Sequence, residues 1–135
     1  MPQQQGSSSS SGGRVDGSLQ QTAVVVGNFV AGAGWGTVAV LALDAPAGAV
    51  NTDQRGQIKI TASTTGVAQA TATVVHTFAD GAYATPPIGI VQTTNDNSID
   101  TGRCTCVTTT TTATWTFSLL PVDTKVYKFK YLYVA

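Results

Sequence analysis

Residue types that commonly carry catalysis are scarce in this sequence. It has one histidine, His76, and every acidic residue is an aspartate, so paired carboxylates of the glycosidase type have weak support. No Gly-x-Ser-x-Gly turn accompanies the histidine, although a Ser-His-Asp arrangement built by the fold stays open. His76 alternates with Val74 and Phe78, which is typical of a core or rim histidine. We therefore expect no enzyme activity and no cofactor.

The two cysteines, Cys104 and Cys106, stand two residues apart in the stretch RCTCV. On a strand they face the same side, about 6.5 Å apart along the chain. A disulfide needs its Cβ atoms about 3.8 Å apart, so this spacing does not suit one. No further cysteine completes a zinc site. The sequence predicts two free thiols and no metal.

A polar loop at 93–102 gathers side chains with hard oxygen ligands. Such ligands suit calcium, but the same residue types are first of all turn formers. Both interpretations stay open for Asn95, Asp96, Asn97, Ser98 and Asp100.

A second polar stretch, NTDQRG at 51–56, leads into an apolar alternating run. Asp53 and Arg55 are two residues apart there. We expect them to form a local pair that stabilises the turn.

Charge and length limit the class of protein. The 135 residues carry seven Lys and Arg against seven Asp, so the net charge of zero gives no electrostatic footprint for nucleic acid or an anionic membrane. Only 10% of residues are charged, against about a quarter in typical proteins. A chain buried in an assembly, or a very stable secreted β-domain, has this composition.

One segment, Ala23 to Leu43, is uncharged and long enough to cross a bilayer. The glycine cluster AGAGWG lies at its middle, and no basic residues flank it. We therefore expect two strands joined by a turn, and no membrane span. The N-terminus also lacks the basic and apolar regions of a secretory signal.

The chain divides into a low-complexity arm at 1–20 and a β-domain at 21–135. Short Val, Ile, Thr and aromatic runs alternate with Gly, Pro, Asn and Asp clusters, which is a strand and turn pattern. The fold class expected is all-β: an antiparallel two-sheet sandwich, jelly-roll-like, of about eight strands with an N-terminal extended arm. The predicted strands are 22–30, 36–43, 56–62, 70–78, 87–93, 103–110, 113–119 and 125–134.

Alternation assigns faces within these strands. The last strand places four aromatic side chains on one face and two lysines on the other, so it should be central in its sheet. Those aromatics are Tyr127, Phe129, Tyr131 and Tyr133. The runs TATVVHTF and TATWTF each present a threonine face, which can pack flat against another protein or stand in solvent.

Residues 50–135 resemble β-sandwich modules of tailed-bacteriophage virion proteins from tail fibres, head fibres and capsid decorations. The stretches that carry the resemblance are VNTDQRGQIKIT, TATVVHTFADGAYATPPIGIVQT, TATWTF and the aromatic close YKFKYLYVA. Within them, Asp53 and Gly56 form an acidic turn before a strand, and Tyr83 leads through a turn to a proline-initiated strand. The Cys-Thr-Cys strand and the threonine run at 108–112 depart from the pattern.

The resemblance implies a structural or adhesive protein of the virion, usually a homotrimer, with no catalysis and no cofactor. Other capsid or tail proteins would be its partners. The arm would order on its partner through an anchor near Arg14, Val15 and Leu19. The alternative is a module that binds a host receptor or glycan, for which Trp35 and Tyr83 are the candidate exposed aromatics.

Overall fold

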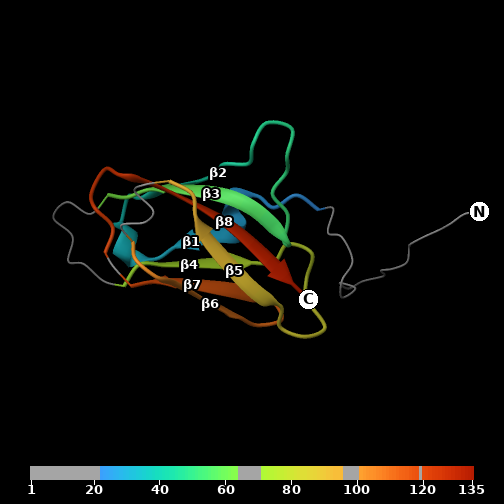
Figure 1. Cartoon of the computed structure of the whole chain (residues 1–135). Helices are drawn as coiled ribbons and strands as arrows, with labels where there is room; N and C mark the ends of the chain where they lie inside the picture. The colour runs from blue at the N-terminus through green and yellow to red at the C-terminus, as the bar shows by residue number, and fades with distance from the viewer. Residues whose placement is uncertain (1–21, 64–70, 96–100, 119) are drawn as a thin grey trace, which may run out of the picture.

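The computed structural model describes residues 22–63, 71–95, 101–118 and 120–135. These residues form a sandwich of two antiparallel four-stranded sheets, seen as two layers in Figure 1. The first sheet has the order β1-β4-β7-β6 and the second sheet has the order β2-β3-β8-β5. The strands are β1 (Phe29–Ala31), β2 (Val40–Leu43), β3 (Arg55–Thr61), β4 (Thr73–Thr77), β5 (Ile88–Thr93), β6 (Cys104–Thr108), β7 (Thr112–Phe117) and β8 (Val126–Val134).

The all-β sandwich predicted from the sequence is confirmed. Each expected strand has its counterpart, and several are shorter than expected, the first most of all. In place of a strand over 22–30, Ala23 forms an isolated bridge with Thr52, and a 3-10 turn, η1 (Val26–Asn28), precedes β1. Asn28 stabilises this turn because its side-chain oxygen accepts a hydrogen bond from the backbone N–H of Val25.

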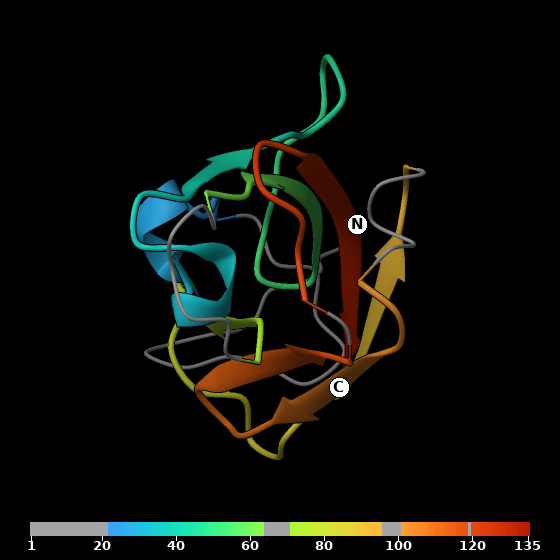
Figure 2. The ribbon, with the colours of Figure 1, turned by 90° about the vertical axis from the view of Figure 1, so that its left-hand side faces the viewer.

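Most connections pass from one sheet to the other, which is the jelly-roll-like feature of the fold. Only β2–β3 and β6–β7 are hairpins within a sheet among the described strands. Where β5 and β6 meet, the two sheets approach closely, and Figure 2 shows this side of the sandwich. A side chain at Gly89 of β5 would collide with Cys106 of β6, so this position requires glycine.

The aromatic strand β8 lies between β3 and β5, as its four-aromatic face predicts. Tyr127, Phe129, Tyr131 and Tyr133 are all buried. Phe129 packs on Phe117 of β7 across the sandwich, and Tyr131 packs on Trp115. Rings of this size bury large apolar areas and dominate the energetics of a core. The centre of the domain is therefore aromatic.

The outer faces of the two sheets differ in character. On the first sheet every outward strand residue is Thr or Val, and none is charged: Val30, Thr73, Val75, Thr77, Thr105, Val107, Thr112, Thr114 and Thr116. We call this surface the threonine face. The outer face of the second sheet carries Arg55, Lys59, Lys128 and Lys130, together with exposed Ile88, Ile90, Leu132 and Val134.

The uncharged segment 23–43 consists of short strands and two 3-10 turns, η1 and η2 (Ala33–Trp35). In the described residues no helix is long and apolar enough to cross a membrane. The expected arm at 1–20 lies outside the described residues.

Candidate functional site

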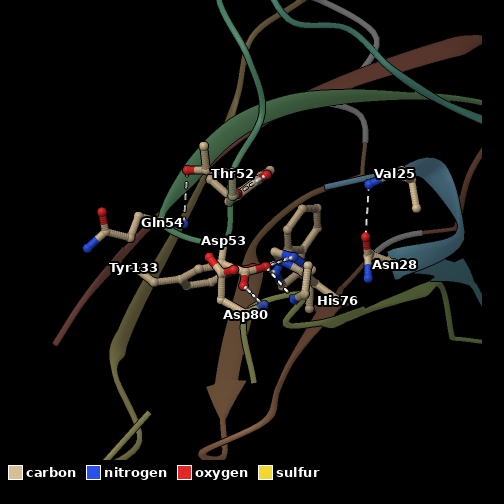
Figure 3. A network of polar contacts seen from close by, with 11 residues as sticks. Val25, Asn28, Thr52, Asp53, Gln54, His76, Asp80 and Tyr133 are labelled. Atoms are coloured by element: carbon tan, nitrogen blue, oxygen red, sulfur yellow. Dashed lines mark hydrogen bonds and ion pairs between the residues drawn. The ribbon is translucent and has the colours of Figure 1, made fainter. Parts of the chain in front are cut away.

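A buried carboxylate organises the loop that precedes β3. Asp53 is fully buried, and its two oxygens accept hydrogen bonds from the backbone N–H groups of Ala79 and Asp80, each at 2.7 Å (Figure 3). The expectation of a local turn pair with Arg55 is corrected by this geometry, because Arg55 is exposed while Asp53 points inward. Asp53 thereby fastens the start of β3 to the turn that follows β4.

His76 connects this carboxylate to the aromatic core. Its Nδ1 lies 3.0 Å from the hydroxyl of Tyr133, and its Nε2 lies 3.5 Å from Oδ1 of Asp53. The same hydroxyl accepts a hydrogen bond from the indole N–H of Trp115 at 3.0 Å. Because this hydroxyl already accepts from Trp115, we assign it as the donor to Nδ1 of His76, and this assignment leaves a ring proton on Nε2, facing Asp53.

His76 lies between Asp53 and Tyr133, an arrangement like that of a catalytic proton relay. Asp53 and His76 have no exposed surface and Tyr133 has 1%. Burial also raises the pKa of Tyr133 well above its usual value, so the phenol stays protonated. A substrate has no access to this network, and His76 is a core histidine, as its alternation with Val74 and Phe78 predicts. The network joins β4, β7 and β8 to the loop before β3.

The two aromatic residues expected on the surface are buried, and that expectation was wrong for both. Trp35 has no exposed surface: its indole N–H donates to the carbonyl oxygen of Thr73, and its ring packs against Phe117 and Tyr127. The AGAGWG stretch forms η2 instead of a turn between neighbouring strands, which turns Trp35 into the core.

Tyr83 is 2% exposed, and its ring packs edge-on against Phe78 at 5.0 Å. Its backbone N–H donates to the carbonyl oxygen of Thr110. The turn that contains Tyr83 is therefore packed against the loop between β6 and β7, and its ring covers one end of the core.

Cys104 and Cys106 are free and half-buried on the core side of β6, as their spacing predicts. Burial raises the pKa of Cys104 to about 12 and that of Cys106 to about 11. Both thiols are therefore protonated near neutral pH. The described residues contain no cluster of three His, Cys, Asp or Glu side chains that could hold a metal.

The candidate calcium loop falls largely outside the described residues, which omit Asp96, Asn97, Ser98 and Asp100. Asn95 is described, and its amide side chain donates to the carbonyl oxygen of Val126 and accepts from the N–H of Lys128. This side chain fastens the end of β5 to β8.

The predicted arm anchors Arg14, Val15 and Leu19 also lie outside the described residues. Of the predicted recognition residues the structure describes only Trp35 and Tyr83, and both are buried. It shows instead a groove at a place where the sequence indicated no site.

This groove lies between the loop at 44–54 and the outer face of the second sheet, and its volume is about 360 Å³. The loop joins β2 to β3 and projects from the sandwich in Figures 1 and 2. Its tip is a tight turn in which the N–H of Ala49 donates to the carbonyl oxygen of Pro46. Gly48 has φ +80° at the position of that turn that favours glycine. We call this feature the loop groove.

The loop is held over the sheet by Asn51. Its side-chain amide donates to the carbonyl oxygen of Gln57 at 2.7 Å and its side-chain oxygen accepts from the N–H of Gln57 at 2.9 Å. A side chain at Gly56 would collide with Asn51 and with the hydroxyl of Tyr131, so this close approach requires glycine. The loop groove is therefore a built feature of the β2–β3 connection.

The loop groove has an apolar wall and a cationic side. Pro46, Val50, Ile90 and Leu132 supply apolar surface, while Arg55, Gln57, Gln92 and Lys130 supply polar groups. In the sheet register, Leu132 pairs with Arg55 on one side and with Ile90 on the other. Lys130 is one step further along the same outward face, so the two cations are diagonal neighbours, about 7–8 Å apart at their Cα atoms.

Asp44, at the start of the 44–54 loop, is engaged outside the groove. Asp44 lies 3.6 Å from the ammonium groups of both Lys59 and Lys128, and it accepts a hydrogen bond from the side chain of Gln57. Partial burial works to raise the pKa of Asp44, but the Gln57 hydrogen bond and the two lysines outweigh it and lower that pKa. Within the described ranges, neither Arg55 nor Lys130 has an ion pair.

The sequence contained part of the signal for this groove. The alternation of the last predicted strand implied outward positions for Leu132 and Val134, but no face was assigned to Ile88 and Ile90, which the structure shows exposed on β5. The position of the 44–54 loop above these residues could not be predicted, because it depends on the hydrogen bonds between Asn51 and β3, a strand that begins only after the loop.

Comparison of the chain with protein-family models, with curated proteins and with solved structures finds no match.

Proposed function

We propose that this chain is a structural protein of a tailed-bacteriophage virion, a capsid-decoration or fibre-like knob attached to the particle through its N-terminal arm. The resemblance of residues 50–135 to virion β-sandwich modules motivates the proposal. In this role the knob is a homotrimer that contacts other capsid or tail proteins, and it needs no catalysis and no cofactor.

The observation that carries the proposal is the threonine face. A sheet face without charge loses no ionic hydration when another protein covers it. Thr and Val are also stiff at χ1, so ordering them at an interface costs little conformational entropy. A face of nine such residues suits close packing between subunits better than open solvation.

A charge placed on the threonine face tests this directly. Thr114 points outward from β7 in the middle of the face, and Thr61 points outward from β3 in the second sheet. Thr114→Arg should abolish trimer formation and incorporation into particles, while Thr61→Arg should leave both unchanged. Equal incorporation of the two variants would show that the threonine face faces solvent in the particle.

The loop groove favours a second candidate function, a module that binds a host receptor or glycan. Amides and cations beside an apolar wall can hold a polar ligand with one apolar side. Trp35 and Tyr83, the aromatics expected to stack on a sugar, are buried and offer no such platform. Binding of the purified chain to a glycan array, lost in Arg55→Gln and retained in Lys59→Gln, would support this candidate; absence of any glycan signal would reject it.

A further inference from the structure

The loop groove presents two cations next to apolar surface. Arg55 and Lys130 lack a carboxylate partner in the described part of the chain, while Val50, Ile90 and Leu132 beside them are 44–59% exposed. A segment that fits would carry one carboxylate between the two cations and apolar side chains on either side. It would also have to reach the groove.

The described chain begins beside the groove. Ala23 bridges to Thr52, and the N–H of Val24 donates to the carbonyl oxygen of Asn51 at 3.0 Å. Asn51 itself lines the groove. The six residues from Asp16 to Gln21 span about 20 Å when extended, which is enough to fold back from Thr22 over the groove.

The sequence immediately before this point has the required chemistry. Asp16 is the first acidic residue of the chain, and the next one is Asp44. Val15 and Leu19 lie on either side of Asp16, and Gly17 and Ser18, which follow Asp16, permit a turn. The carboxylate matches Arg55 and Lys130 in charge, and the two apolar side chains match the wall of the groove.

We propose that residues 14–19 dock in the loop groove of their own chain, with Asp16 between Arg55 and Lys130 and with Val15 and Leu19 against Val50, Ile90 and Leu132. A tether this short gives the segment an effective concentration on the order of millimolar at its own groove, so a weak interaction suffices and the same chain outcompetes a second copy. The docked state goes beyond the proposed attachment role, because a partner on the particle must displace it.

Trypsin cleavage after Arg14 in the full-length protein measures the docking. A docked segment is protected from trypsin, so loss of one groove cation should accelerate this cleavage. The expected acceleration is about tenfold or more, because a charge-assisted hydrogen bond changes the ratio of docked to undocked segment by that factor. Arg55→Gln and Lys130→Gln should show this acceleration, and so should Asp16→Asn. Lys59→Gln, on the same outward face of β3 but outside the groove, should cleave at the parent rate.

A cysteine pair identifies which chain supplies the segment. In a Cys104→Ala, Cys106→Ala background, Leu19→Cys with Val50→Cys should form an intramolecular disulfide under mild oxidation. Leu19→Cys with Val107→Cys, on the threonine face, should not. The proposal is overturned if the groove variants cleave at the parent rate, if the Val50 pair forms no disulfide, or if its disulfide joins two chains, which would assign the segment to a neighbour.

Discussion

Oδ1 of Asp53 lies 3.5 Å from Nε2 of His76, and both side chains are fully buried between the two sheets. Asp53 belongs to the loop before β3 in the second sheet, whereas His76 belongs to β4 in the first. The contact therefore joins the two layers beside the aromatic core, where the rings of Phe78, Tyr131 and Tyr133 pack around His76. Its stability depends on the backbone N–H groups of Ala79 and Asp80, which satisfy the buried carboxylate.

Removing this carboxylate should destabilise the fold strongly. Asp53→Ala leaves two backbone N–H groups without their acceptor, and we expect the free energy of unfolding to fall by about 3 kcal/mol. Asp44→Ala, which removes an aspartate paired at the surface, should cost less than about 1 kcal/mol. Urea denaturation followed by fluorescence compares them, and equal midpoints for the two variants would contradict the assignment.

The C-terminal strand should be indispensable. Phe129 of β8 has no exposed surface and packs on Phe117, so Phe129→Ala should cost about 3–5 kcal/mol. Removal of 125–135 takes out one of the two central strands of the second sheet and should prevent folding. Thermal unfolding measured by circular dichroism checks both, and a truncated chain that melts cooperatively near the full-length temperature would show that β8 is peripheral.

The thiols should be slow to react in the folded protein. With pKa values of about 12 and 11, Cys104 and Cys106 carry little thiolate at pH 8, so a thiol reagent should modify them far more slowly than in the unfolded chain. Folding favours their neutral form, so this contribution to stability is complete below pH 9 and is lost as the pH rises from 9 towards 11–12. Two thiols titrated after denaturation without reductant, and a denaturation midpoint that falls above pH 9, are the expected results. A disulfide or stoichiometric zinc would refute the prediction.

The purified protein should be a trimer. The threonine face provides an uncharged surface for subunit packing, and the resemblance to virion modules gives the number of subunits. Light scattering at micromolar concentration measures the mass directly. A monomer in solution would confine trimer formation to the particle, and a monomer on the particle as well would end the proposal.

Much of the fold was predictable from the sequence because alternation reports burial directly. The faces of β3, β4, β7 and β8 followed from alternating apolar residues, and so did the central place of β8. The cysteine spacing gave the state of both thiols. Each of these features depends on the residue pattern within a single strand.

Features that depend on contacts distant in sequence were not predictable. Trp35 stands among glycines that suggested an exposed turn, but Gly36 at φ +98° packs against Ser63 and turns the indole inward. Asp53 appeared to belong with Arg55, its neighbour in sequence, until the fold brought the Ala79 and Asp80 amides to it. The loop groove depends on Asn51 in the same way.

The most direct test of the account is deletion of residues 2–18, followed by assembly with the virion to which the proposed function assigns this chain. The account predicts that the shortened protein still unfolds cooperatively, with a melting temperature lowered only by the loss of the docked segment, because the buried core residues run from Val24 to Tyr133. It also predicts loss of the protein from purified particles. Full incorporation of the shortened protein would contradict the central claim that the N-terminal arm attaches this knob to a virion.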